Sequence, residues 1–400
     1  RNALYDEGFS GTRPVAVSGL RSLLSGALGI VDHSIRANRR DDGLYHAYNI
    51  LELSDDRSEA RIERLYEMLE GQVAALSSGF VGPEEAVEII DTLFAGPMYR
   101  PGQHSFMLYP ERRLPPFMDK NRVPENRVMS IPLLAGLVRE GDGSIIERDA
   151  ADVFRFNADF SNSADLSKAL DGLRLKGGER AKRVESDREA VIDLFEDIFD
   201  HQSFTGRSGT MYAYEGLGSI YWHMVSKLLL SVQEAALKAA RGGVVESTAH
   251  SGPAPEEASK LIDAYYRIRS GLGFEKSAGE YGAFPFDPYS HTPPHGGASQ
   301  PGMTGQVKEE IIARTGELGI AVEGGLLSFR PLMLRESELL EAPGTFRYYD
   351  VEGSEKKIEL EAGSLAFTVC QVPVVYRRSK GSAKLNVKEK GGKDRVIEGS

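Results

Sequence analysis

Cysteine is nearly absent from this sequence, since Cys370 is the single one among 400 residues. One cysteine cannot form an intrachain disulfide, and it excludes a zinc site built from several thiolates. The sequence therefore does not require an oxidising compartment, and we expect a cytoplasmic protein. A run of about 18 apolar residues is also lacking, so no membrane-spanning helix and no membrane partner are expected.

Positive charge is in the minority, with 48 Lys and Arg against 59 Asp and Glu and a formal net charge of −11. Nucleic acids and anionic lipids are bound through basic surfaces, so this balance argues against both as partners. A small anion such as phosphate remains compatible with the charge, because a few local donors can hold it.

The sequence also lacks an initiator methionine and a signal peptide, since it starts Arg-Asn-Ala-Leu. We therefore expect that the true amino terminus is not included.

Helical periodicity dominates up to residue 323, and short strand-like segments follow. Helices are expected at Pro14–Asn38 and Ser58–Leu76, and the strongest is expected to begin near Glu215 and to be buried on more than one side. From Gly324 onward, apolar segments bounded by Gly, Asp or charged pairs indicate antiparallel strands, one of them at Leu365–Tyr376. The prediction is a mainly helical domain at 1–323 and a β-rich domain at 324–400.

Two stretches lack a clear period. Tyr99–Asn126 is rich in Pro and Arg and is predicted to be a long ordered loop, which is a frequent place for functional residues. Arg174–Asp187 is charged and contains glycines, so it is predicted to be a solvated excursion without a site role.

A first candidate constellation runs from Tyr212 to His223. If a helix starts near Glu215, then Glu215, Trp222 and His223 lie along one face and can meet in one cavity. A carboxylate, an indole and an imidazole suit a sugar, because they accept hydroxyl hydrogen bonds, cover an apolar sugar face and donate to an anion. The alternative is a capped core helix with a satisfied histidine.

A second constellation runs from Asp287 to Gln306 and ends where a helix is expected to start. Thr304 is a good N-cap, and the free N–H groups of Thr304 and Gly305 would make a seat for an anion. An ordinary cap with turn glycines explains the same residues. His291 and His295 could suggest a metal, but the two prolines between them exclude a helix and no third ligand is evident, so no metal is predicted.

A third constellation joins Asp42–Asn49 to Met68–Gly79. Gln72 could hydrogen-bond a sugar hydroxyl, and a polar contact between helices is an equal alternative.

These segments resemble the cellobiose phosphorylase family and the related cellodextrin and glucan phosphorylases. The segment Glu70-Gly-Gln-Val-Ala-Ala-Leu-Ser-Ser-Gly is similar to the family's Asn-Pro-Gln-x-Trp-Ala-Val-Leu-Ser-Gly, and Glu215 to His223 resembles its Glu-Asn-Gly-Gly-x-Tyr-x-His. Met303-Thr304-Gly305, followed by Gly316-Glu-Leu-Gly-Ile and Leu327–Leu334, resembles its Thr-Gly, Ile-Leu-Gly-Ile and Pro-x-Leu-Pro succession. The resemblance covers most of the chain, in the same order and rough spacing.

The resemblance implies an (α/α)6 toroid, also called a six-hairpin toroid, incomplete at its amino terminus and followed by a small antiparallel β-sandwich domain. It places His223, Thr304 and Gly305 around phosphate, and Glu215 at the sugar, with Trp222 and Gln72 as further sugar contacts. Gly216 departs from the family, which has asparagine there, and the Pro-Arg loop and the Arg174 excursion have no counterpart, so substrate specificity stays open.

The implied reaction is inverting phosphorolysis of a β-glucosidic oligosaccharide to a sugar 1-phosphate, with inorganic phosphate as co-substrate and no cofactor. A single general acid suffices, and the family carries it in a Trp-Asn-Asp segment that is not present here. Glu7, in Tyr5-Asp6-Glu7-Gly8, is a weak match that lies too close to the Glu70 segment. We expect the acid before Arg1, in an amino-terminal part of the same enzyme, which would leave this chain without a proton donor.

Two alternatives remain open. An inverting hydrolase of the same architecture would need a second carboxylate aimed at water, which Asp287 or Glu215 could supply. A non-catalytic glycan-binding or interaction domain would need no catalytic carboxylate. The sequence leaves the oligomeric state open, and a homodimer is one possible assembly.

Overall fold

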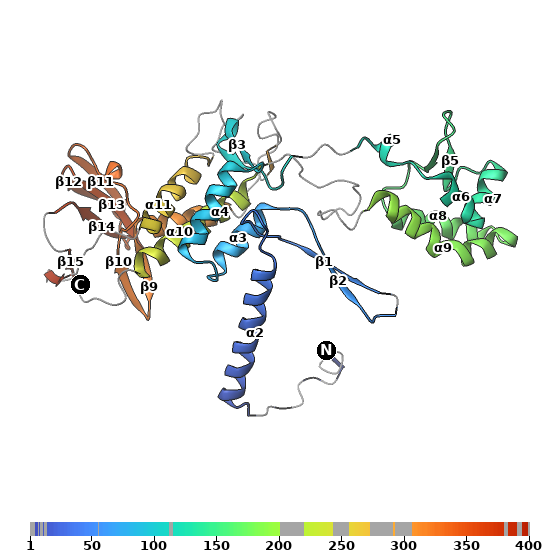
Figure 1. Cartoon of the computed structure of the whole chain (residues 1–400). Helices are drawn as coiled ribbons and strands as arrows, with labels where there is room; N and C mark the ends of the chain where they lie inside the picture. The colour runs from blue at the N-terminus through green and yellow to red at the C-terminus, as the bar shows by residue number, and fades with distance from the viewer. Residues whose placement is uncertain are drawn as a thin grey trace. The chain divides into compact units, whose positions relative to one another are not determined.

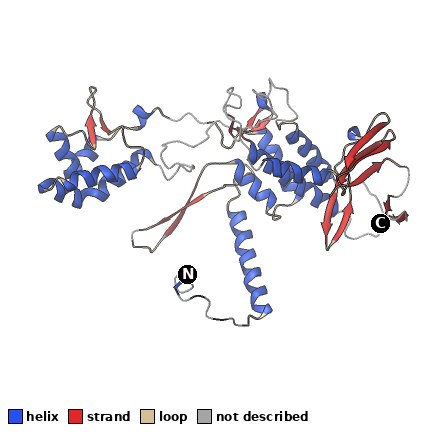
Figure 2. Ribbon diagram, turned by 180° about the vertical axis from the view of Figure 1, so that it is seen from behind, coloured by secondary structure: helices blue, strands red, loops and turns tan. Residues whose placement is uncertain are grey.

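A computed structural model describes residues 5–6, 8, 11, 14–54, 56–111, 115–200, 220–242, 256–272, 291–292, 306–379, 383–389 and 394–398. Helices predominate in these residues, and all strands pair antiparallel in sheets of two (Figures 1 and 2). The mainly helical class is therefore confirmed, whereas the described helices do not confirm a toroid. No helix in these ranges combines the length and apolarity needed to cross a membrane.

Two compact units make up the chain. The first comprises Arg1–Ala75, Asp91–Val225 and Gly271–Thr304, and the second comprises Leu76–Ile90, Ser226–Ser270 and Gly305–Ser400. The expected domain boundary between residues 323 and 324 falls inside the second unit and stays a prediction.

The first helix, α2 (Val17–Ala37), confirms the helix expected at Pro14–Asn38, and none of its residues is buried. The helix expected at Ser58–Leu76 is wrong over its first half. There β1 (Asn49–Leu53) and β2 (Ala60–Arg64) form an antiparallel hairpin, and α3 begins only at Leu69 and ends at Ser77. Asp56 closes the hairpin, because its Oδ1 accepts hydrogen bonds from the hydroxyls of Ser54 and Ser58 and from the Ser58 N–H.

The predicted long loop at Tyr99–Asn126 contains short regular elements. After α4 (Pro83–Ala95) come β3 (Tyr99–Arg100), the 3-10 turn η1 (Pro101–Gln103) and β4 (Ser105–Phe106). The loop prediction is thus only partly right, because pairing of β3 with β4 buries Phe106.

A compact hydrophobic core organises the next stretch of chain, from Val123 to Phe199. Its elements are α5 (Phe117–Lys120), α6 (Glu125–Ser130), α7 (Pro132–Glu140), β5 (Ile146–Arg148), β6 (Phe154–Phe156), α8 (Ser163–Leu175) and α9 (Gly178–Phe199). The side chains of Asn162 and Asp187 cap α8 and the start of α7.

The solvated excursion predicted at Arg174–Asp187 is wrong, because most of it is the first half of α9. Val184 is fully buried, and the helix continues this apolar stripe through Val191 and Phe195. The charges occupy the outer side of the helix, where Arg180 pairs with Asp142 at 2.8 Å. A high density of charge therefore marked one helical face rather than a loop.

The second unit contains most of α10 (Trp222–Gly242), together with α11 (Glu256–Arg269) and α13 (Gln306–Glu317). Four antiparallel hairpins follow α13, and Figure 2 shows how strands replace helices there. The paired strands are β9 (Ile320–Glu323) with β10 (Leu326–Phe329), β11 (Gly344–Tyr349) with β12 (Glu355–Leu360), β13 (Ser364–Val369) with β14 (Val372–Arg377), and β15 (Lys384–Lys388) with β16 (Asp394–Glu398). A 3-10 turn, η4 (Glu336–Glu338), lies between β10 and β11.

The β-rich character predicted from Gly324 onward is confirmed. One predicted strand, Leu365–Tyr376, is instead a hairpin that turns at Cys370 and Gln371, both of which have positive φ (48° and 66°). Residues other than glycine rarely adopt this conformation, so a cysteine followed by a glutamine did not predict a turn. The described sheets are two-stranded, so the sandwich stays a prediction.

Candidate functional site

The candidate site begins where a short strand leads into a long buried helix. β7 (Ile220–Tyr221) ends directly before α10, which starts at Trp222. The helix expected from Glu215 is therefore wrong at Ile220 and Tyr221. Both are strand-favouring residue types, and the two glycines before them disfavour a helix.

Trp222 and His223 occupy the first turn of α10 but differ in accessibility. Trp222 is fully buried, whereas His223 is half-buried. The His223 Nδ1 lies 3.4 Å from the hydroxyl of Tyr221, and the two rings meet edge to face with centroids 5.8 Å apart. The Tyr221 ring therefore lies beside the imidazole at the start of α10, and the start of a helix is a favourable place for an anion.

The strand before α10 brings together two of the predicted constellations. β7 pairs antiparallel with β8 (His291–Thr292), so that Tyr221 is opposite His291 and Ile220 is opposite Thr292. β4 also lies against β7. His291 and Thr292 of the Asp287–Gln306 constellation therefore lie directly beside the two residues that precede α10.

Gln72 is fully buried, and its side chain binds main-chain groups of the protein. Its Oε1 accepts a hydrogen bond from the Tyr45 N–H at 2.9 Å, and its Nε2 donates to the Tyr45 carbonyl at 2.8 Å and to the Met68 carbonyl at 3.0 Å. These are polar contacts within the protein, the role that the sequence left open as an alternative to binding a sugar. A sugar contact by Gln72 stays a prediction.

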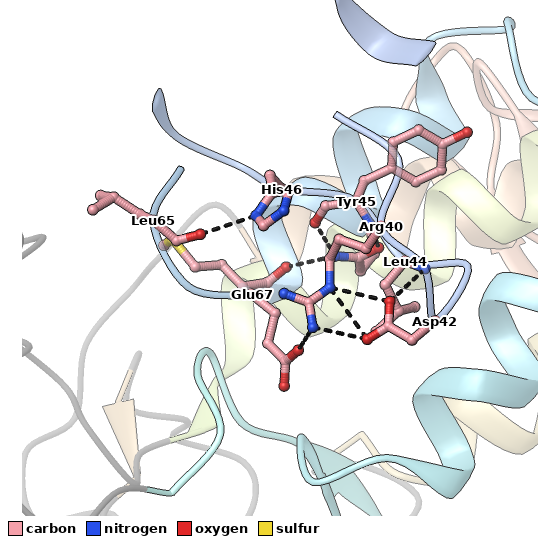
Figure 3. Close-up of polar contacts among 9 residues, drawn as sticks. Arg40, Asp42, Leu44, Tyr45, His46, Leu65 and Glu67 are labelled. Atoms are coloured by element: carbon pink, nitrogen blue, oxygen red, sulfur yellow. Dashed lines mark hydrogen bonds and ion pairs between the residues drawn. The ribbon is translucent and has the colours of Figure 1, made fainter. Parts of the chain in front are cut away.

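An ion-pair cluster holds the same loop, and Figure 3 shows its residues. The Arg40 guanidinium pairs with Asp42 at 2.8 Å and with Glu67 at 2.5 Å. The hydrogen bond to Asp42 is the main cause that raises the pKa of Arg40, and the same bond lowers the pKa of Asp42. The carbonyl of Leu65 lies 3.0 Å from the His46 Nδ1. The cluster fixes the Asp42–His46 turn over α3.

Several predicted residues lie outside the described part of the chain. They are Glu7, Glu215, Asp287, His295, Thr304 and Gly305. Among the described residues, no three or more His, Cys, Asp or Glu side chains are arranged to hold a metal ion.

A buried network in the second unit was not among the predicted sites. Glu317, at the end of α13, is 1% exposed and accepts a hydrogen bond from the Tyr265 hydroxyl at 2.5 Å. Arg269 lies 3.2 Å from the same carboxylate, and Arg314 pairs with both Glu317 and Glu338. Burial, followed by the bond to Glu317, raises the pKa of Tyr265. In the sequence, Glu317 stands between glycines and apolar residues. An isolated acidic residue in such a segment was the feature that could have predicted a buried carboxylate.

A neighbouring set of contacts ties α11 to the segment before η4. The Tyr266 hydroxyl donates to the Met333 carbonyl at 2.7 Å, and the Arg335 guanidinium lies 3.7 Å from the centroid of the Tyr266 ring. Tyr376, on β14, donates to the Leu318 carbonyl. α11, the end of α13 and the first hairpins after it are therefore one connected structure.

Comparison with known proteins gives one similarity. Residues 114–202 match the family model described as GH149 phosphorylase insertion domain 2. The match covers less than a quarter of the chain and coincides with the core formed by α5–α9, β5 and β6. None of the curated proteins matches the chain. The match includes part of the Tyr99–Asn126 stretch and all of Arg174–Asp187, and it supports a glycoside phosphorylase.

Proposed function

We propose that this chain is part of an inverting glycoside phosphorylase that cleaves a β-glucosidic oligosaccharide with inorganic phosphate. One observation carries the assignment, namely the match of residues 114–202 to a phosphorylase insertion domain. The helical chain with a β-rich end is compatible with a toroid and an appended β domain, which we propose as the complete architecture.

The proposed phosphate contacts are His223, Thr304 and Gly305. The pairing of β7 with β8 supports this set, because it brings His291 and Thr292, which precede Thr304 in the sequence, beside the residues that lead into α10. Because His223 is only half-buried, its imidazole is suited to meet an anion at the start of the helix. Thr304 and Gly305 directly precede α13 in the sequence, where backbone donors are available. We propose Glu215 and Trp222 as sugar contacts.

In the proposed reaction a phosphate oxygen attacks the anomeric carbon while the glycosidic C–O bond breaks on the opposite face. A general acid donates its proton to the departing oxygen, and the products are an inverted sugar 1-phosphate and a saccharide shortened by one unit. Phosphate takes the place of water, so no second carboxylate is needed as a base.

The function is tested with the full-length protein and a panel of β-linked gluco-oligosaccharides, with and without inorganic phosphate. We expect release of α-glucose 1-phosphate that depends on phosphate and negligible free glucose in its absence. Equal release of free glucose without phosphate would establish the hydrolase instead. No turnover of any β-glucoside in either condition would leave the phosphorylase proposal without support.

The phosphate site is tested by His223→Ala, with Tyr221→Phe as a matched control that keeps the imidazole. Loss of a hydrogen bond to a charged group costs about 1.5–3 kcal/mol, which corresponds to a rise of about 10- to 100-fold in the KM for phosphate. Tyr221→Phe removes only a long contact and is expected to change this KM by about threefold at most. An unchanged KM for phosphate in His223→Ala would remove His223 from the site.

A further inference from the structure

Two polar side chains, Arg100 and Ser105, share one face of the β3–β4 hairpin. They are directly opposite each other in the antiparallel register, and side chains in opposite positions of such a pair lie on the same face. Tyr99 and Phe106 form the neighbouring pair and therefore lie on the other face, where their ring centroids are 5.0 and 4.9 Å from that of Phe94. The aromatic rings thus pack on one side of the hairpin, and Arg100 and Ser105 lie on the opposite side.

The Ser105 hydroxyl is a buried donor without a hydrogen-bond partner in the described part of the chain. Ser105 is 1% exposed, and a buried hydroxyl that stays unpaired is destabilising. The preceding residue, His104, has a φ of 49°, a left-handed conformation that costs energy for residues other than glycine. A strained turn and an unpaired hydroxyl therefore coincide at this point of the fold, which indicates a ligand site.

The guanidinium of Arg100 is half-buried and has neutral partners. It donates to the Gln103 Oε1 at 3.2 Å, and its second contact, at 2.8 Å, is the Met107 sulfur, which is a weak acceptor. Among the described residues no carboxylate forms an ion pair with Arg100. By contrast, Arg40 and Arg155, which are also partly buried, each pair with an aspartate, at 2.8 and 2.6 Å.

The pKa of Arg100 shows the same difference. Burial is the main cause that lowers the pKa of Arg100, whereas the hydrogen bond to Asp42 raises that of Arg40. The positive charge of Arg100 therefore carries a desolvation cost that no carboxylate offsets. An oxyanion would offset it, because a guanidinium can donate two parallel hydrogen bonds to carboxylate or phosphate oxygens.

The β3–β4 hairpin lies beside the strand that leads to His223. The Cα atom of Ser105 is within 8 Å of that of Ile220 or Tyr221, the two residues of β7. His223 follows β7 by two residues, and all of these residues belong to the first unit. The hairpin therefore brings the unpaired hydroxyl and the guanidinium into the region of the proposed phosphate contact.

We propose that Arg100 and Ser105 donate hydrogen bonds to the same phosphate that His223 contacts, an inference that rests on the proposed function. The guanidinium and the hydroxyl together supply several donors, and the phosphate oxygens accept them. A guanidinium only donates, so it suits an oxyanion better than a sugar hydroxyl, which also needs an acceptor for its proton. Arg100 further supplies a local positive charge in a chain whose formal net charge is −11.

The test measures the dissociation constant of inorganic phosphate for the full-length protein by isothermal titration calorimetry. In Arg100→Met, which retains an apolar side chain of similar length, we expect this constant to rise by about 10- to 100-fold. Arg122→Met is the matched control, because it removes the same charge from an exposed side chain of the same unit and should change the constant by less than about twofold. The dissociation constant of the oligosaccharide, measured without phosphate, should be unchanged in both variants.

Ser105→Ala is the second variant, and it should weaken phosphate binding by about tenfold. Because the Ser105 hydroxyl has no partner in the described part of the chain, its loss should leave the unfolding midpoint unchanged. Ser105→Ala therefore decides the matter even if Arg100→Met does not fold.

The outcomes separate this inference from the proposed function. A wild-type enzyme that carries out phosphorolysis, together with Arg100→Met or Ser105→Ala variants that bind phosphate as tightly as Arg122→Met, overturns the inference alone. Weaker binding of the oligosaccharide with unchanged binding of phosphate would place the two residues at the sugar and would also overturn it. A wild-type protein that neither binds phosphate nor forms a sugar 1-phosphate overturns both the inference and the proposed function.

Discussion

Removal of the Glu317 carboxylate is the most informative single perturbation of the second unit. Glu317→Ala leaves the buried Tyr265 hydroxyl without its acceptor, and it leaves Arg269, whose side chain is 19% exposed, without its carboxylate. Arg314 loses one partner but keeps Glu338 at 2.6 Å. Breaking a buried ion pair by removing one member typically costs about 3–5 kcal/mol. Because Arg314 stays paired, we expect a loss of about 3 kcal/mol in the free energy of unfolding.

The assay is denaturant unfolding followed by far-ultraviolet circular dichroism, together with hydrogen exchange of the α13 amides, which belong to the second unit. Glu256→Ala serves as a matched control, because its pair with Lys260, at 2.7 Å, is exposed to solvent and contributes little to stability. The double variant Glu317→Gln with Tyr265→Phe should lose less than the sum of the two single changes, since both remove the same hydrogen bond. A Glu317→Ala variant within about 1 kcal/mol of the wild type would refute the network as a stabilising element.

Two further predictions concern the loop over α3. Gln72→Ala removes the hydrogen bonds that Gln72 makes with the N–H and C=O of Tyr45, so it should destabilise the protein by about 2–4 kcal/mol. It should also speed hydrogen exchange of the Tyr45 amide, and an unaltered exchange rate would contradict these contacts. The Tyr48 hydroxyl donates a hydrogen bond to Glu70 at 2.7 Å, and this bond raises the pKa of Tyr48 to about 12. Glu70→Gln should return the pKa of Tyr48 toward 10, which a carbon-13 NMR titration of the tyrosine ring would measure. The pKa of Tyr48 is higher in the folded protein than in the unfolded chain, so this hydrogen bond stabilises the fold below about pH 10. Its contribution is lost as the pH rises toward 12. If Tyr48 titrated near pH 10 in the wild type, the hydrogen bond to Glu70 would be excluded.

Long periodic elements were predictable from the sequence, and tight turns were not. α2, α11, α13 and the carboxy-terminal strands follow their apolar periods, so their existence could be read directly. The β1–β2 hairpin was missed because its turn includes Arg57 at a φ of 56°, a conformation that the residue type does not announce. The first half of α9 was missed because charge masked the apolar stripe through Val184.

In the candidate site, as in the fold, local features were predictable from the sequence and long-range contacts were not. The sequence selected Gln72 and His223 as polar residues on apolar helices, and both do lie in such settings. It could not predict that Gln72 binds the main chain of Tyr45, since main-chain partners have no residue signature. The pairing of β7 with β8 involves two residues on each side, and strands that short carry no detectable period. These contacts depend on tertiary packing rather than on local pattern.

Inverting phosphorolysis is tested most directly by phosphorus-31 NMR of the full-length protein with a β-linked gluco-oligosaccharide and inorganic phosphate. We expect a growing signal of α-glucose 1-phosphate, formed with inversion at the anomeric carbon and at a rate that follows the phosphate concentration. Release of free glucose at a rate independent of phosphate, with no phosphate ester formed, would contradict it.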